Sequence, residues 1–222
     1  MQKLNLGCGH IQPQGWENVD GSMRAWLASR LSWLDRLLTR LGVLPPTEFN
    51  RSTRFANLLK RLPWSDNSVD CIYLGEVLEH FTREDGLRLL SECFRILKPA
   101  GIIRVRVPDN ARFWRSYLKE FDEIHARPRT AWTEDHSRWV EMFFRDICVR
   151  RRWRGSFGHY HKWMYDEISL VRTLERVGFV EAESRGFHDS AIPDIKEVEG
   201  REDLTVEGRK PSAPKPEAPV KE

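Results

Sequence analysis

The chain begins with a short apolar strand that runs straight into a glycine turn, and this feature constrains its fold more than any other. The segment reads Leu4-Asn5-Leu6-Gly7-Cys8-Gly9, and a second short run, residues 16–20, ends on the carboxylate of Asp20. In an open α/β sheet, ligands bind beyond the carboxyl ends of the strands, where a glycine lets the backbone come close. The two strand ends therefore predict one site for a nucleotide-like ligand, in which Asp20 accepts hydrogen bonds from both hydroxyls of a ribose.

Strand-like and helix-like segments alternate along most of the chain. Apolar side chains recur at helical spacing over residues 83–97, which Pro99 to Gly101 would stop, and over residues 166–177, which Gly178 would cap. This alternation predicts an α/β fold with a doubly wound, mainly parallel sheet. Residues 179–210 instead hold two strands and a loop, which indicates a hairpin. The expected strands are residues 3–6, 16–20, 55–58, 69–74, 102–107, 179–187 and 204–208.

Composition fits one domain with its own core. The 222 residues are 40% hydrophobic, and their net charge of +3 argues neither for nor against nucleic acid. The cysteines form no C-x-x-C pair, so neither a disulfide framework nor a zinc site is expected. No apolar run reaches the roughly 20 residues that span a bilayer, and no cleavable signal precedes the first strand, so a cytoplasmic location is expected. The four cysteines are Cys8, Cys71, Cys93 and Cys148.

Three further motifs follow in a fixed order. They are Leu62-Pro63-Trp64-Ser65-Asp66-Asn67-Ser68-Val69-Asp70, Val77-Leu78-Glu79-His80 and Arg95-Ile96-Leu97-Lys98-Pro99-Ala100-Gly101. With them, the chain resembles the type 11 branch of the class I S-adenosylmethionine (SAM) dependent methyltransferases. The resemblance covers residues 2–110 motif by motif and extends more loosely to Lys210. It implies a Rossmann-like, seven-stranded sheet with a C-terminal antiparallel hairpin, and SAM as the cofactor.

The resemblance also implies where SAM binds. Gly7 and Gly9 would let the backbone approach its methionine portion, and Asp20 would take the ribose hydroxyls. The rival reading, a nicotinamide dinucleotide site, needs G-x-G-x-x-G and an acidic residue about 20 positions further on. Gln12 stands where the third glycine would be and Asp20 comes too soon, so the rival reading is disfavoured. The expected cofactor-binding residues are Leu6, Gly7, Cys8, Gly9, Asp20, Gly21, Asn57, Leu58, Gly75 and Glu76.

Two of these positions depart from the family pattern. Asn57 stands where an Asp usually accepts from the adenine amino group, so a weaker hydrogen bond is expected, while Leu58 would pack on the purine. Glu76 follows Gly75 at the level of the sulfonium, where the family commonly has His. The Glu76 carboxylate would attract the sulfonium or point toward substrate; a solvated loop carboxylate is the plainer alternative.

Methyl transfer is an in-line displacement at carbon, so the protein mainly aligns the acceptor, excludes water and removes a proton. His161, Asp109 and Glu76 are the candidate catalytic bases. Asp109 follows the fifth strand, and His161 lies with His159 just before the last helix. A packing or capping role is the alternative for both histidines, and His80 is interpreted mainly as structural. No metal is expected.

Two segments interrupt this core within a single domain of residues 1–210, and a third segment follows the domain. Residues 22–46 would form an inserted amphipathic helix over 22–41, capped by Ser22, that packs on the sheet; a substrate lid and contact with an anionic membrane are alternatives. Residues 110–160 would form a helical cover over the active site. Residues 211–222 would be a disordered tail.

The acceptor is less constrained. This branch is often associated with glycan gene clusters, and five tryptophans suit stacking on sugar rings, although they would equally close a small core. Five arginines could bind a phosphate, a nucleotide-linked sugar or an RNA backbone, or form a solvated face, but no RNA-binding module accompanies them. These residues are Trp114, Trp132, Trp139, Trp153 and Trp163, and Arg145, Arg150, Arg151, Arg152 and Arg154.

Together these features predict methyl transfer to an oxygen of a glycan or glycosylated intermediate. A small metabolite or lipid-like molecule is the alternative acceptor. A SAM-binding or partner-binding protein without catalysis is the alternative from another class, motivated by Asn57 and Glu76.

Overall fold

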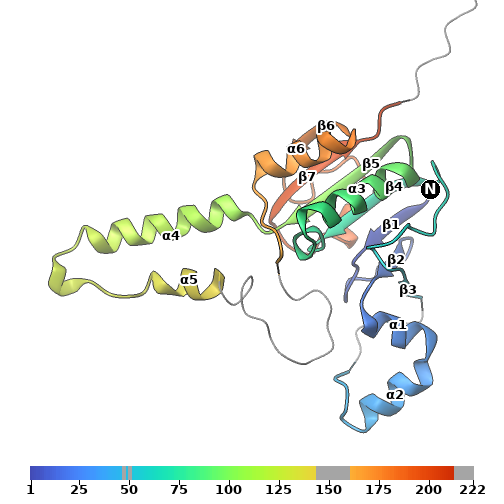
Figure 1. The fold of residues 1–222 in the computed structure, drawn as a ribbon, viewed down its shortest axis with the longest axis horizontal. Coiled ribbons are helices and arrows are strands. Elements are labelled where there is room, and N and C mark those ends of the chain that lie inside the picture. The colour runs from blue at the N-terminus through green and yellow to red at the C-terminus, as the bar shows by residue number, and fades with distance from the viewer. Residues whose placement is uncertain (47–48, 50–51, 144–160, 213–222) are drawn as a thin grey trace, which may run out of the picture.

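The computed structural model describes residues 1–46, 49, 52–143 and 161–212, which build a seven-stranded sheet in the order β3-β2-β1-β4-β5-β7-β6 (Figure 1). Strands β1 to β5 pair in parallel, whereas β7 runs antiparallel to both β5 and β6. The predicted fold class, with its antiparallel C-terminal hairpin, is confirmed. The strands are β1 (Lys3–Leu6), β2 (Glu17–Asp20), β3 (Arg54–Phe55), β4 (Val69–Gly75), β5 (Leu97–Val107), β6 (Val180–Ser184) and β7 (Leu204–Arg209).

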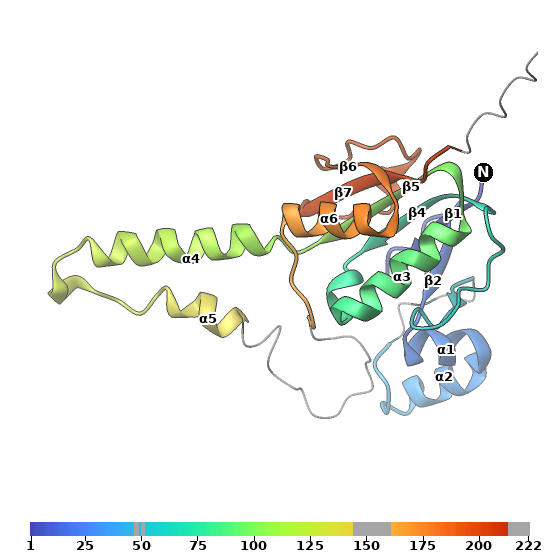
Figure 2. The same cartoon turned by 45° about the horizontal axis from the view of Figure 1, so that its top comes forward.

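Two helices, α3 and α6, pack side by side against one face of the sheet (Figures 1 and 2). Side chains alternate along a strand, so Ile103 and Val105 of β5 point into this main core while Arg104 and Arg106 point to the other face. The helices are α1 (Met23–Arg30), α2 (Ser32–Arg40), α3 (Arg83–Ile96), α4 (Asn110–His125), α5 (Ser137–Phe143) and α6 (Glu167–Val177), with 3-10 turns η1 (Leu78–His80), η2 (Arg129–Ala131) and η4 (Ile195–Glu197).

Local sequence explains where α3 and α6 begin and end. The Thr82 side chain accepts from Asp85 N at the start of α3, and Asp166 and Ser169 form a capping box at the start of α6. Gly178 ends α6 in the left-handed conformation, at φ 113°. Both helices match their predicted ranges within a residue or two. Residues 99–101 do not form the expected stop. Helix α3 already ends at Ile96, because β5 begins at Leu97 and runs through residues 99–101.

The opposite face of the sheet is covered by the connection between β6 and β7. Ile192, Ile195 and Val198 from this connection pack on Cys71 and Tyr73 of β4 in a second, smaller core. The hairpin prediction treated this segment only as a loop. Its packing makes it the cover of one face of the sheet.

The predicted single helix over residues 22–41 is wrong, because the chain forms two helices there. Leu31 leaves the helical region at φ −130° and ψ 50°, and α2 then folds back on α1, where Arg24 lies 3.4 Å from the buried carboxylate of Asp35. Ser22 does cap α1, since its side chain accepts from Ala25 N. The pair lies at the β3 edge of the sheet (Figure 1).

The apolar stripe predicted for this segment is only partly buried in α2. Leu37 and Leu41 are 45% and 65% exposed, whereas Leu34 and Leu38 are half-buried. The expected packing of this stripe therefore holds only in part. Contact with a bound substrate or with an anionic membrane stays a prediction. In the described chain, no helix has the length and apolar character needed to cross a bilayer.

The described part of the expected cover forms an arm that projects from the body of the domain (Figures 1 and 2). Helix α4 runs outward and α5 returns beside it. Phe113 of α4 makes an edge contact with Trp139 of α5 at 5.5 Å, and the Trp139 indole donates to Glu120. Aromatic residues of the arm therefore close a small core of their own. Cys148, Trp153, His159 and the five clustered arginines lie outside the described residues, as does the tail beyond residue 212.

Candidate active site

The glycine turn after β1 is held against the end of β2 by hydrogen bonds. Gly7 N and Cys8 N both donate to Val19 O, at 2.7 and 3.0 Å, and Gly9 N donates to Asp20 Oδ2 at 3.3 Å. Both glycines have a positive φ, 72° for Gly7 and 49° for Gly9. The predicted meeting of the two strand ends is therefore present in the fold.

The two glycines are needed for different reasons. A Cβ at Gly7 would lie 2.1 Å from Val77 Cγ2, so packing within the protein requires this glycine. A Cβ at Gly9 would meet no heavy atom within 4 Å, so the space beside Gly9 is open to a ligand. Leu6 and Cys8 are buried, which leaves their backbone rather than their side chains for ligand contacts.

Asp20 stands at the centre of this edge. Its Oδ1 accepts from Ser22 N at 2.8 Å and its Oδ2 from Gly9 N, while each carboxylate oxygen can accept more than one hydrogen bond. The side chain is 9% exposed and held in place by these backbone donors. Hydroxyl donors beside Gly9 would find the remaining acceptor positions, so this edge fits a ribose.

The end of β3 lies next to Asp20, because Ala56 N donates to Asp20 O at 3.2 Å. This strand is shorter than the predicted 55–58 and lies earlier in the chain. Asn57 is exposed, and its Oδ1 accepts from Leu59 N at 2.9 Å. Leu58 is 8% exposed and belongs to the main core, with its Cγ 3.6 Å from the Cβ position of Gly21.

Glu76 follows β4 and is engaged with two arginines. Its backbone adopts φ 59°, and its carboxylate forms ion pairs with Arg201 and, at 3.7 Å, with Arg106 Nη2. Burial raises the pKa of Glu76, while the two guanidinium groups oppose this rise. Glu76 therefore ties β4 to the segment before β7. At Gly75 a Cβ would lie 2.6 Å from the Tyr73 hydroxyl, so packing explains that glycine.

Glu79 is a site residue that the sequence analysis did not single out. It is 1% exposed, and neither carboxylate oxygen has a hydrogen-bond partner in the described chain. Burial, and next the negative charge of Glu76, raise the pKa of Glu79 to about 8. Its position in the otherwise apolar run Val77-Leu78-Glu79 was the available signal.

The turn η1 brings Glu79 and His80 next to His161. His80 Nε2 lies 4.0 Å from Glu79 Oε1, and the rings of His80 and His161 meet edge to face at 5.2 Å. Lys162 N and Trp163 N both donate to Glu79 O, at 2.7 and 3.2 Å, which fixes the His161 segment to η1. We call Glu79, His80 and His161 the η1 cluster.

Comparison with known proteins agrees with this geometry. A family model described as a methyltransferase domain, from the type 11 branch, matches residues 47–105, a range that includes Asn57, Gly75 and Glu76. A probable S-adenosylmethionine-dependent methyltransferase of Mycolicibacterium smegmatis is 34% identical over 128 residues, which are 58% of this chain and 46% of that protein. Residues 47–105 belong to a methyltransferase domain of the type 11 branch. The chain spans about half the length of this curated relative.

Solved structures share the fold of this methyltransferase domain. A SAM-dependent methyltransferase from Methanosarcina mazei has a TM-score of 0.50 at 17% identity, with 96% of this chain and 93% of that chain covered. A second from Archaeoglobus fulgidus has a TM-score of 0.51 at 13% identity, with 94% and 86% covered. At these identities the likeness concerns the fold alone.

The third predicted base, Asp109, caps helix α4 of the methyltransferase domain. Its Oδ1 accepts from Ala111 N and Arg112 N, at 2.9 and 3.1 Å, and its own N–H donates to Asp203 Oδ1 at 3.0 Å. Asp109 therefore holds the end of β5 to the start of β7. Its role as a base stays a prediction.

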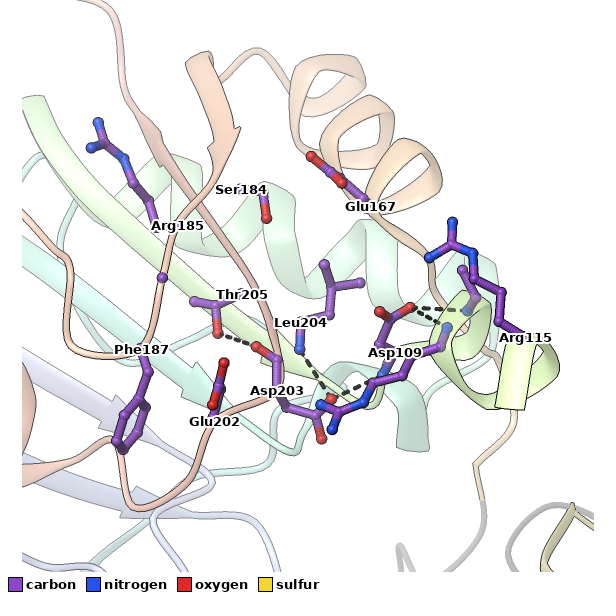
Figure 3. A pocket seen from close by; sticks show the side chains of 13 residues that line it. Asp109, Arg115, Glu167, Ser184, Arg185, Phe187, Glu202, Asp203, Leu204 and Thr205 are labelled. Atoms are coloured by element: carbon purple, nitrogen blue, oxygen red, sulfur yellow. Dashed lines mark hydrogen bonds between the residues drawn. The ribbon is translucent and has the colours of Figure 1, made fainter. Parts of the chain in front are cut away.

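Asp109 also lines a cavity of about 340 Å³ at the β5, β7 and β6 end of the sheet (Figure 3). Both guanidinium groups and carboxylates line it, and Phe187 stands at one side. The cavity is distinct from the glycine turn, which lies across β4 and β5 on the β1 side. Its lining includes Asp109, Arg112, Arg115, Glu167, Arg185, Phe187, Glu202 and Asp203.

Proposed function

We propose that this methyltransferase domain binds SAM along the carboxyl ends of β1 to β4 and transfers the methyl group to an oxygen of a glycan or glycosylated intermediate. One observation carries the cofactor part of the proposal. The hydrogen bond from Gly9 N to Asp20 Oδ2 joins the ends of β1 and β2, and the space beside Gly9 is open. A carboxylate and a bare backbone turn together suit a ribose and an amino acid group.

Each residue of this edge has a defined task. Asp20 accepts hydrogen bonds from the ribose hydroxyls, using the carboxylate lone pairs that Gly9 N and Ser22 N do not occupy. Asn57 presents its amide near the adenine, where it lacks the charge of a carboxylate. When bound, SAM supplies an electrophilic methyl group; the protein contributes alignment and exclusion of water.

We assign removal of the acceptor's proton to the η1 cluster. His161 is the member that the sequence nominated, and its ring meets the ring of His80 edge to face at 5.2 Å, beside the buried Glu79. Glu76 and Asp109 are less suited, because Glu76 is paired with Arg201 and Asp109 caps α4.

The cavity of Figure 3 supports an acceptor rich in hydroxyl groups. Carboxylates such as Glu202 and guanidinium groups such as Arg112 can accept from and donate to hydroxyls, and Phe187, 41% exposed, offers a ring face. A lipid-like acceptor would find few apolar side chains there.

Calorimetric titration of the purified protein with SAM, and separately with S-adenosylhomocysteine, tests the cofactor part. Both are expected to bind, Asp20→Ala is expected to abolish binding, and Asp122→Ala on the arm is the matched control. A folded protein that binds neither ligand would instead support the non-catalytic alternative. With binding established, transfer of a labelled methyl group to nucleotide sugars and glycan fragments tests the acceptor, and transfer only to small metabolites or lipids would contradict it.

A further inference from the structure

The η1 cluster has the composition of a metal site. Glu79, His80 and His161 each offer one ligand atom, and these three atoms lie within 4.8 Å of one another. Two imidazoles and one carboxylate form a set that Zn²⁺, Fe²⁺ and Mn²⁺ bind in proteins. We propose that the η1 cluster binds a divalent transition-metal ion.

The spacing suits a site that closes on its metal. Ligand atoms about 2.0–2.2 Å from a tetrahedral metal ion lie roughly 3.5 Å apart. His80 Nε2 and Glu79 Oε1 are 4.0 Å apart and all three ligand atoms lie within 4.8 Å of one another, so binding of an ion would draw them closer together. Both histidines are partly exposed, which gives an ion access from solvent.

The buried carboxylate is an independent observation that points to a cation. Both Glu79 oxygens are inaccessible and lack hydrogen-bond partners among the described residues, although the side chain is 1% exposed. The charged form of a buried carboxyl group without a hydrogen-bond partner carries a large desolvation cost, which a bound cation would offset. The neighbouring charges are Glu76, which favours a cation, and Arg106 and Arg201, which already pair with Glu76.

The main chain holds the ligands in place before any metal arrives. Glu79 O accepts hydrogen bonds from Lys162 N and Trp163 N. The backbone that follows His161 is therefore held next to the backbone of Glu79. His80 N donates to the carbonyl of Val77, the residue just before η1, at 3.1 Å. The sequence analysis expected no metal. His161 lies far along the chain from the other two ligands, so the sequence alone does not bring the three together.

Three protein ligands leave at least one coordination position open, which is the arrangement of catalytic metal sites. The role of the metal rests on the proposed function, in which the η1 cluster removes the acceptor's proton. With the ion bound, His161 would be a ligand rather than the base. A hydroxyl of the acceptor at the open position would then lose its proton more readily, and the proton would pass to solvent water. Binding of the metal itself does not depend on SAM or on an acceptor.

The test uses the full chain without an affinity tag, stripped of metal with a chelator and titrated with Zn²⁺ in a calorimeter and with Co²⁺ by visible absorption. One ion per chain is expected, with a Co²⁺ spectrum typical of nitrogen and oxygen ligands. Loss of a group that only supports a metal ligand already costs about 10- to 100-fold in metal affinity. Glu79→Gln and His161→Ala each change a proposed ligand itself, so each should weaken binding at least about tenfold. His125→Ala, which removes an exposed histidine of the arm, is the matched control and should leave binding unchanged.

Binding that is absent, or equally strong in Glu79→Gln and His161→Ala, would overturn the proposal. Circular dichroism checks that the variants fold, and Glu79→Asp serves as a conservative variant that retains a ligand oxygen if Glu79→Gln does not fold. SAM titration of the same samples separates the two proposals. Metal binding without SAM binding would defeat only the proposed function, and SAM binding without metal binding would defeat only the metal site.

Discussion

Arg104 and Glu199 form a two-armed ion pair in the interior, 95 residues apart in the chain, with Nε to Oε1 at 3.0 Å and Nη2 to Oε2 at 2.9 Å. Both side chains are fully inaccessible to solvent. Arg104 also donates to the carbonyls of Gly186 and Asp189. This one guanidinium therefore fixes the connection between β6 and β7 onto the second face of the sheet.

Removal of the Glu199 carboxylate should destabilise the fold strongly. Glu199→Ala leaves Arg104 buried without its main partner, and breaking a buried pair in this way costs about 3–5 kcal/mol. Urea denaturation followed by circular dichroism measures the loss. Glu123→Ala is the control, because its pair with Lys119 is exposed and should contribute about 0–1 kcal/mol. Similar losses of stability in Glu199→Ala and Glu123→Ala would show that the buried pair of Arg104 and Glu199 is not a main source of stability.

Gly7 should tolerate alanine far less well than Gly42. Both have a positive φ, at 72° and 70°, which costs an alanine about 1–2 kcal/mol. Only at Gly7 would the new Cβ also collide with Val77. We expect Gly7→Ala to lose about 1–3 kcal/mol more than Gly42→Ala in thermal or urea unfolding, since overpacking costs that much. Adding Val77→Ala should reduce the excess; an excess that persists would show that the collision is not its cause.

Asn57→Asp should tighten SAM binding. A charged acceptor forms a stronger hydrogen bond to the adenine amino group, and a gain of about 1 kcal/mol corresponds to about fivefold in affinity. Calorimetry of both proteins measures the change. Gln14→Glu adds the same charge at an exposed position and should have little effect. Equal or weaker binding by Asn57→Asp would argue that residue 57 does not meet the adenine.

Glu92 should make stability depend on pH in the acid range. The hydrogen bond from Arg95 holds the pKa of Glu92 below its ordinary value of 4.5. The folded state therefore gains stability from this carboxylate above pH 4.5 and loses it as the pH falls through the lowered pKa. Glu92→Gln should be less stable than the parent at neutral pH, with the difference shrinking in acid. A constant difference across urea titrations at several pH values would contradict this linkage.

The approximate positions of the strands and the core helices along the chain could be predicted from sequence because their signals are local. Apolar periodicity, the Thr82 and Asp166 caps and the end of α6 at Gly178 all act within a few residues. The same holds for the glycine turn beside Asp20, where strand ends meet by the geometry of a parallel sheet. The break at Leu31 had no such signal, since no glycine or proline marks it.

The sequence by itself determined the α/β class, the meeting of the glycine turn with Asp20 and the candidate His161. Only the tertiary structure decided what that histidine meets, that Glu79 lies beside it without a hydrogen-bond partner in the described chain, and that Arg104 is buried against Glu199. The physical reason is that these contacts join residues far apart in the chain. Their pairing depends on how the whole sheet and its covering segments pack, which no local pattern of residues encodes.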